Sequence, residues 1–118
     1  ASVGLLFKDC VNEFGHEILS GHFHDTRAMA LANVCAALSA GVRKFDSCIG
    51  GLGGCPFAPG AAGNLATEDL ANMLDQMGFT TQIDLNKLSE IVLFCENQLN
   101  APLGGRMSAW LNKQNKSN

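Results

Sequence analysis

The spacing of apolar positions divides the chain into alternating helical and extended segments. Near the start, apolar residues recur at spacings of three and four, which places them on one face of a helix that Gly15 can end. They are Val3, Leu6, Phe7, Cys10, Val11 and Phe14. The next segment, residues 18–24, is short and leads into Asp25 and Thr26, either of which can cap a following helix. We interpret residues 18–24 as a buried strand.

A second helix and a second strand follow. Residues 27–40 are rich in Ala and Leu, and Gly41 can take the left-handed conformation that closes a helix. Residues 42–48 are the second strand candidate. They lead into residues 49–64, where glycines permit positive φ and the close approach of a ligand, while two prolines stiffen the path. This composition predicts a shaped loop rather than a flexible linker.

Two further helices are predicted after the loop. Residues 67–69 are Thr, Glu and Asp, which cap and charge the start of a helix that ends before Gly78. Asp84 precedes another helix, which ends near Pro102. We expect the ordered domain to span residues 1–103 and the remainder, residues 104–118, to be a C-terminal tail that is frayed from Lys113. The apolar faces of the two helices are Leu70, Met73, Leu74 and Met77, and Leu85, Leu88, Ile91, Val92, Cys95 and Leu99.

The order of these elements is helix, strand, helix, strand, loop and helix. That alternation is typical of parallel α/β architecture, in which crossover helices cover a buried sheet. Two or three strands leave sheet edges unpaired, and such edges associate unless something covers them. The pattern therefore indicates part of a larger barrel or sheet.

Composition and charge narrow the function classes. The chain has 118 residues, of which 47% are hydrophobic and 16% charged, enough for one core and too few for two full domains. A formal net charge of −3 offers no basic excess for nucleic acid or an anionic membrane. No apolar run approaches the roughly 18 residues of a spanning helix. Five cysteines without a CxxC pair favour a reducing cytoplasm over a disulfide scaffold or a zinc ribbon.

The first candidate chemistry is a pair of histidines. His22 and His24 are two residues apart, so in a strand both imidazoles project from the same face while Phe23 points the other way. They also lie at the end of the strand, where ligands gather in α/β barrels. A metal-binding pair is one interpretation. The other is two ordinary histidines, one bonded to a backbone carbonyl and one exposed, and the HxH spacing leaves both open.

Three other residues have both a chemical and a structural interpretation. Cys55 lies in the glycine-rich turn, where backbone N–H groups can stabilise a thiolate, so it is a candidate acid or base or else an inert packed thiol. Asn64 offers a neutral oxygen ligand for a hard divalent cation, or is a turn residue. Asp25 is a helix cap that also adjoins His24 and could support it.

Two strings of residues resemble one known family. They are HFHDT at residues 22–26 and GLGGCPFAPGAAGNLATED at residues 51–69, and they closely resemble the hydroxymethylglutaryl-CoA lyase family. The resemblance runs from about Leu19 to about Leu99. Homocitrate and isopropylmalate synthases share an HxH strand but differ in the GLGGCP loop, so the lyase branch is preferred.

The resemblance implies a (β/α)₈ TIM barrel that binds Mg²⁺ or Mn²⁺ and cleaves 3-hydroxy-3-methylglutaryl-CoA to acetyl-CoA and acetoacetate. His22 and His24 match the family's two histidine ligands and Asn64 its amide ligand. Cys55 matches a loop cysteine that would move a proton to or from the departing enolate, and Glu68 matches an acidic residue near the site. This is coherent chemistry, because a divalent cation can polarise the substrate hydroxyl and stabilise the alkoxide as the C–C bond breaks.

The chain also departs from the family's pattern. The family's remaining metal ligand is an aspartate on the first strand, accompanied by an arginine, and nothing here corresponds to them. A barrel of this kind takes about 250 residues, and this chain begins just before what resembles the sixth strand. We therefore expect the C-terminal portion of a barrel, inactive by itself. Its expected partners are the acyl-CoA substrate and either the N-terminal half of the barrel or another copy of the chain in a homo-oligomer.

Two alternative functions remain open. One is a catalytically silent half-barrel that acts as an assembly module, which an in-frame upstream sequence carrying Arg-Asp at a first strand end would exclude. The other keeps the lyase chemistry but acts on another branched 3-hydroxyacyl-CoA. Arg27 follows the HFHDT string and can meet an anionic group or lie solvated at a helix start.

Overall fold

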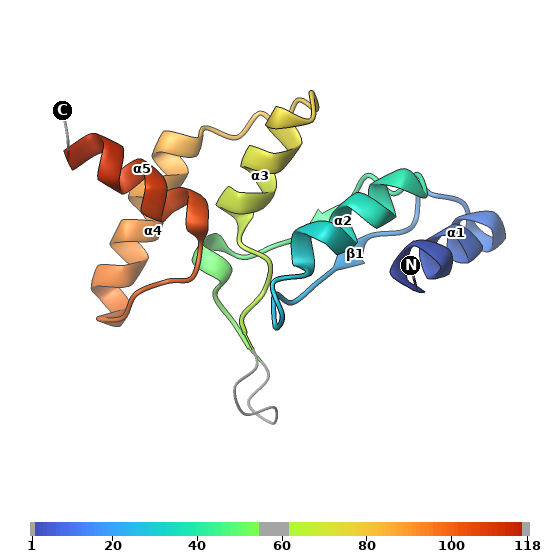
Figure 1. Cartoon of the computed structure of the whole chain (residues 1–118), viewed down its shortest axis with the longest axis horizontal. Helices are drawn as coiled ribbons and strands as arrows, with labels where there is room; N and C mark the ends of the chain where they lie inside the picture. The colour runs from blue at the N-terminus through green and yellow to red at the C-terminus, as the bar shows by residue number, and fades with distance from the viewer. Residues whose placement is uncertain (1, 55–61, 117–118) are drawn as a thin grey trace.

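The computed structural model of the protein describes residues 2–54 and 62–116. Its helices are α1 (Ser2–Phe14), α2 (Ala30–Ser39), α3 (Thr67–Gln76), α4 (Leu85–Leu99) and α5 (Arg106–Lys116), and its strands are β1 (Gly21–His22) and β2 (Phe45–Asp46). One 3₁₀ turn, η1 (Ile49–Gly51), follows β2. The molecule is elongated and flat, 49 × 37 × 21 Å, with α1 at one end and α4 and α5 at the other (Figure 1).

The two strands are parallel, as expected for an α/β unit. Gly21 pairs with Phe45 and His22 with Asp46. A third extended segment joins their carboxyl ends, because Asn64 forms an antiparallel bridge with His24 and Ala66 a parallel bridge with Cys48. Together these pairings place residues 21–24, 45–48 and 64–66 beside one another at the carboxyl ends of the two strands.

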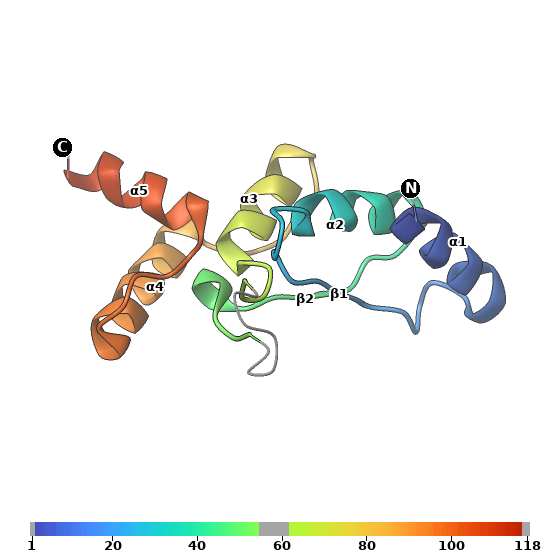
Figure 2. The same cartoon turned by 60° about the horizontal axis from the view of Figure 1, so that its bottom comes forward.

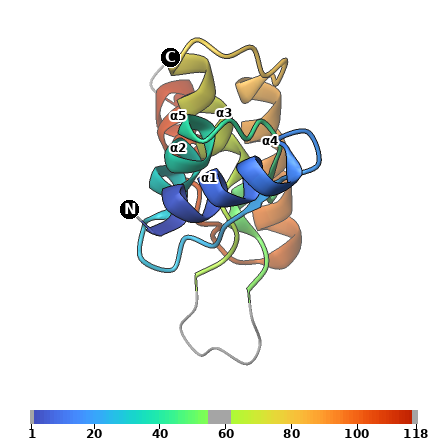
Figure 3. The ribbon, with the colours of Figure 1, turned by 90° about the vertical axis from the view of Figure 1, so that its right-hand side faces the viewer.

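The core lies between the strands and the helices on one side of them. Figure 2 shows α2 and α3 on the same side of β1 and β2, and Figure 3, along the long axis, shows α1 in front of α2. Side chains from both helices and from the strand segments fill this layer. Its buried cluster is Ala30, Val34, Leu38, Leu65 and Leu70, and Phe23, Leu31, Phe45, Met73 and Leu74 pack against it.

The strands are shorter and more exposed than the sequence pattern predicts. The prediction of a buried strand over residues 18–24 was wrong, because only Gly21 and His22 form it and Ile18 is 74% exposed. Within the described residues β1 pairs with β2 alone. One edge of β1 is therefore unpaired in the described part of the chain, and on the face opposite the helices the side chains of His22 and Asp46 are 56% and 62% exposed.

The local signals at several helix ends act as predicted. Gly15 and Gly41 follow α1 and α2 with φ of 80° and 104°, the left-handed region that glycine adopts without strain. Asp84 caps α4 by accepting from the backbone N–H groups of Asn86 and Lys87. Each of these ends depends on residues close in sequence, which is why the sequence pattern predicts them.

The start of α3 and the segment after residue 104 differ from the sequence prediction. Thr67 is the first residue of α3 rather than its cap, and its hydroxyl bonds that of Ser47 at 2.8 Å. The segment expected to be a tail from residue 104 carries α5, whose first backbone N–H groups, at Arg106 and Met107, donate to Asp69. A carboxylate 37 residues earlier in the chain thus caps α5.

The apolar faces of α1 and α4 are only partly covered. No residue of α1 is buried, and Leu6 and Phe14 are 61% and 60% exposed. On α4, Leu88 and Val92 are buried, whereas Ile91 and Leu99 are 46% and 55% exposed. In the part of the chain that the structure describes, no helix has the length and apolarity needed to cross a membrane.

Candidate functional site

The two predicted histidines lie together on the open face of the strands. Alternation along the strand sends Phe23 into the core and leaves His22 and His24 on the opposite side. Their ring centroids are 5.4 Å apart and their planes are inclined by 54°. Two imidazoles thus face one region of space at the carboxyl end of β1.

Each imidazole meets an acceptor at its Nδ1 atom. His22 Nδ1 is 3.5 Å from Oδ2 of Asp46, its register partner on β2. His24 Nδ1 is 3.4 Å from the carbonyl oxygen of Ala62. An acceptor at Nδ1 favours the tautomer that carries the proton there, which leaves the Nε2 lone pair free to bind a cation.

Asn64 brings an oxygen ligand to the same place. Its backbone pairs with that of His24, and residues opposite one another in an antiparallel pair have side chains on the same face. The amide Nδ2 donates to the Leu52 carbonyl at 2.9 Å and lies 3.3 Å from the Cys48 sulfur. Oδ1 is buried and makes no hydrogen bond within the described residues. A buried acceptor without a donor costs about 1–3 kcal/mol, so this oxygen is suited to bind a cation.

The carboxylate of Asp25 acts as a helix cap in this structure. Its Oδ1 accepts from the Ala30 N–H at 3.0 Å, at the start of α2. The backbone N–H of Asp25 donates to the Gly63 carbonyl at 3.1 Å. Asp25 therefore ties the segment before Asn64 to the end of β1 through its main chain, while its side chain serves α2.

Glu68 lies in the interior, between three elements. It is completely buried, and its two carboxylate oxygens accept from the backbone N–H of Gly50 at 3.0 Å and from the Ser108 hydroxyl at 3.3 Å. A side chain at Gly105 would overlap Oε1. Glu68 thus joins η1, α3 and α5, and its carboxylate holds the beginning of the glycine-rich segment in place.

Sequence reasoning missed two polar residues on the histidine side. Asp46 contacts His22, and Cys48 contacts Asn64. Their spacing of two along the second strand candidate matches that of the two histidines, and this alternation was the available signal. We call the group His22, His24, Asp46, Cys48 and Asn64 the histidine face. The predicted proton carrier Cys55 lies outside the described residues.

The donor set of the histidine face suits a divalent cation but supplies little charge. Within residues 2–54 and 62–116 no group of three or more His, Cys, Asp or Glu residues is arranged to hold a metal ion. Two imidazole nitrogens and one amide oxygen of this face are accepted ligands for divalent metals. His22, His24 and Asn64 could therefore hold part of a divalent-metal site.

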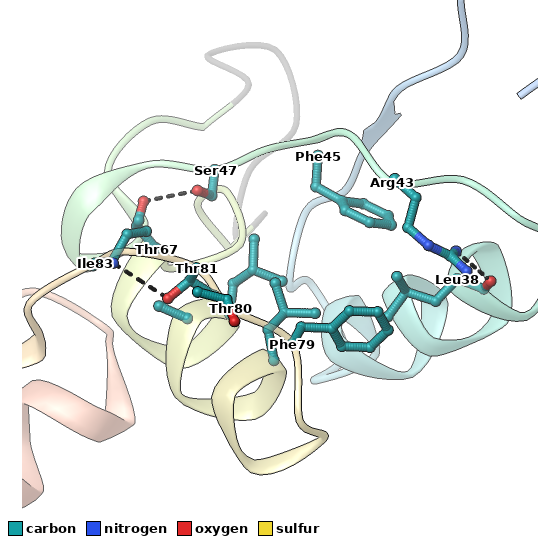
Figure 4. Close-up of a pocket in the computed structure, with 12 residues that line it drawn as sticks. Leu38, Arg43, Phe45, Ser47, Thr67, Phe79, Thr80, Thr81 and Ile83 are labelled. Carbon is teal, nitrogen blue, oxygen red and sulfur yellow. Dashed lines mark hydrogen bonds between the residues drawn. The ribbon is translucent and has the colours of Figure 1, made fainter. Parts of the chain in front are cut away.

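A cavity of about 370 Å³ lies on the other side of β2 (Figure 4). Phe45 and Ser47 line it, and they alternate with Asp46 along the strand. Ser47 bonds Thr67, and the Arg43 guanidinium lies 5.7 Å from the centre of the Phe79 ring. Because Phe45 and Ser47 point away from the side of Asp46, the strand separates this cavity from the histidine face.

The chain is a parallel α/β unit with two histidines at the end of a strand, and comparison with known proteins gives its family. The HMGL-like family model matches residues 5–94, so the chain belongs to the HMGL-like family. It is 46% identical over 112 residues to the hydroxymethylglutaryl-CoA lyase of Pseudomonas mevalonii, covering 95% of this chain and 33% of that protein. Against the Bacillus subtilis lyase it is 43% identical, covering 90% and 36%.

Solved structures agree with this assignment. The chain superposes on a hydroxymethylglutaryl-CoA lyase from Pseudomonas aeruginosa with a TM-score of 0.90 at 37% identity, covering 96% of this chain and 38% of the other. An HMG-CoA lyase from Acinetobacter baumannii, in complex with coenzyme A and 3-methylmalate, gives 0.86 at 41% identity, covering 91% and 35%. The chain thus spans about a third of the length of its relatives. The resemblance to the lyase family and the correspondence to part of its TIM barrel are confirmed.

Proposed function

We propose that the chain is the part of a hydroxymethylglutaryl-CoA lyase that supplies His22, His24 and Asn64 to a Mg²⁺ or Mn²⁺ site. The whole protein cleaves 3-hydroxy-3-methylglutaryl-CoA to acetyl-CoA and acetoacetate. One observation carries the proposal: Asn64, which is paired with His24 beside the second imidazole, has a buried Oδ1 without a hydrogen-bond partner among the described residues. The curated relatives of this chain are named as lyases of this substrate.

The residues of the histidine face have distinct tasks in this proposal. When bound, the divalent cation supplies the charge that polarises the substrate's C3 hydroxyl and stabilises the alkoxide during C–C cleavage. Asp46 and the Ala62 carbonyl hold the two rings at Nδ1, so that both Nε2 atoms are free. The Leu52 carbonyl holds the Asn64 amide with its oxygen unpaired. Cys55 is proposed to move the proton to or from the departing acetyl-CoA enolate.

The proposal also assigns the substrate class and the partner. The Acinetobacter baumannii relative binds coenzyme A, which supports an acyl-CoA substrate. The open edge of β1 and the exposed apolar side chains of α1 and α4 favour contact with further protein, and we assign this surface to the rest of the barrel. Association of copies through it is the second candidate, and it is the basis of the assembly-module alternative.

The cation site can be tested on the chain by NMR. We expect Mn²⁺ to broaden the backbone resonances of residues 22–24 and 62–66 selectively, because its paramagnetism acts at short range. The double variant His22→Ala/His24→Ala should lose this effect. His16→Ala is the matched control, since His16 is an exposed histidine away from the strands. Broadening that persists in the double variant, or that centres elsewhere, would contradict the proposed site.

A further inference from the structure

The carboxylate of Asp46 lies beside the imidazole of His22. The two are direct register partners in the parallel β1–β2 pair, so their side chains project from the same face. The Asp46 carboxylate makes its ion-pair contact with His22 Nδ1 at 3.5 Å, and within the described residues it makes no hydrogen bond. Among the residues that the structure describes, it caps no helix, unlike Asp25 and Asp69.

The chemistry of imidazole gives this contact a consequence. A neutral imidazole carries one proton, and only the nitrogen without it can bind a cation. His24 takes its acceptor from the main chain, at the Ala62 carbonyl, whereas His22 takes an anionic one from a side chain. A carboxylate on the far nitrogen fixes the tautomer and the ring orientation and raises the basicity of the ligating nitrogen.

Charge gives a second reason for a carboxylate at this position. The three donors of the histidine face, His22, His24 and Asn64, are all neutral when they bind a cation. Asp46 brings a negative charge directly behind one of them. The side chains of His22 and Asp46 are 56% and 62% exposed, so both have room to turn and shorten a contact that is too long for a strong hydrogen bond.

We propose that Asp46 is a positioning residue that holds His22 as the Nδ1–H tautomer and strengthens its Nε2 atom as a cation ligand. The part of this proposal that concerns the cation rests on the proposed function. The part that concerns the tautomer does not, because it is a property of the metal-free chain. The two parts are therefore tested separately.

The tautomer is read from long-range ¹H–¹⁵N correlations of the imidazoles in the metal-free chain, at a pH where they are neutral. We expect His22 to carry its proton on Nδ1 and Asp46→Ala to shift it toward Nε2. Asp46→Asn should keep the Nδ1–H form, because the amide oxygen accepts the same proton. His24 should not change in either variant, since its acceptor is the main chain.

The tautomer test needs a control for the loss of negative charge. Asp9→Asn removes the same charge from an exposed position on α1, and it should leave His22 unchanged. Because Asp46 is largely exposed, its variants are expected to fold, which the dispersion of the amide spectrum checks. A His22 proton on Nε2 in the unmodified chain, or the same tautomer in Asp46→Ala, would overturn the proposal.

The effect on cation binding is measured by Mn²⁺ titration of the same variants. We expect Asp46→Ala to weaken Mn²⁺ binding about 10–100-fold, Asp46→Asn to weaken it less, and Asp9→Asn to leave it unchanged. Unchanged affinity in Asp46→Ala would overturn the role of Asp46 in cation binding. Failure of the unmodified chain to bind Mn²⁺ would instead contradict the proposed function, and the tautomer measurement would still decide the first part.

Discussion

The two ends of the Asn64 side chain are in opposite situations. Nδ2 has an acceptor in the Leu52 carbonyl, whereas Oδ1 is buried and has no donor in residues 2–54 and 62–116. This arrangement fixes the orientation of the amide, because the reversed one would place oxygen against the Leu52 carbonyl oxygen. In the described part of the metal-free protein the Asn64 Oδ1 atom therefore lacks a hydrogen bond, and it is well suited to bind a cation.

Asn64→Asp should therefore have opposite effects with and without metal. A carboxylate oxygen facing the Leu52 carbonyl lowers the free energy of unfolding of the metal-free chain by about 1–3 kcal/mol. The added negative charge should at the same time tighten Mn²⁺ binding. Urea unfolding with and without Mn²⁺ measures both effects, and Asn12→Asp, at an exposed position on α1, is the control. An unchanged response to Mn²⁺ would argue against Oδ1 as a ligand.

The carboxylate of Glu68 requires a glycine beside it. A Cβ at Gly105 would overlap Oε1, whereas a Cβ at neighbouring Gly104 would meet its nearest atom at an ordinary 3.8 Å. We expect Gly105→Ala to destabilise the chain by about 1–3 kcal/mol through overpacking, and Gly104→Ala to have a much smaller effect. Thermal unfolding of the two variants compares them directly. Equal losses of stability in the two variants would show that the contact of Glu68 with the Gly105 backbone does not require a glycine.

For single residues, the sequence predicts which side chains are candidates for the site better than it predicts what those side chains contact. Alternation within one strand was enough to place His22 and His24 on one face. Asp46 and Cys48 could not be paired with them, because that requires the register between two strands. The family resemblance implied that Glu68 lies near the site, and no local pattern reveals that its carboxylate joins η1, α3 and α5.

Some helix ends in this molecule depend on residues close in sequence, and others depend on residues far away in sequence. Gly15, Gly41 and Asp84 act within one turn of the chain, and the sequence predicts them. Helix α5 begins instead at a carboxylate contributed by α3, and its start was not predicted. Strand length is similarly non-local, because a ladder continues only as far as a neighbouring strand accompanies it.

The cap supplied by Asp69 should be measurable through the single tryptophan, Trp110, which lies in α5. Asp69→Ala removes the acceptor of two backbone N–H groups, at Arg106 and Met107, so α5 should lose about 0.5–2 kcal/mol of stability. Denaturant unfolding followed by tryptophan fluorescence reports this loss. Asp9→Ala, on exposed α1, should leave the transition unchanged, and a similar shift in both variants would contradict capping.

On the scale of the whole molecule, the helices cover one side of a very short sheet. The histidine face, the free edge of β1 and the apolar side chains of α1 and α4 remain open. The small number of predicted strands indicated that sheet edges would be left unpaired, and the chain spans about a third of the length of its relatives. The exposed side chains could not be identified in advance, because periodicity shows which face of a helix is apolar and not what covers it.

Activity should accordingly require protein beyond these 118 residues. The proposed ligands His22, His24 and Asn64 are neutral donors, so we expect the purified chain with Mn²⁺ to form no detectable acetoacetate from 3-hydroxy-3-methylglutaryl-CoA. Mixing it with the portion of the Pseudomonas mevalonii lyase that precedes the matched region should restore cleavage, and His22→Ala in this chain should abolish it again. The added portion alone is the control for residual activity. Turnover by the 118-residue chain alone would show that its own residues complete the site, while a stable but inactive complex would favour the silent assembly module.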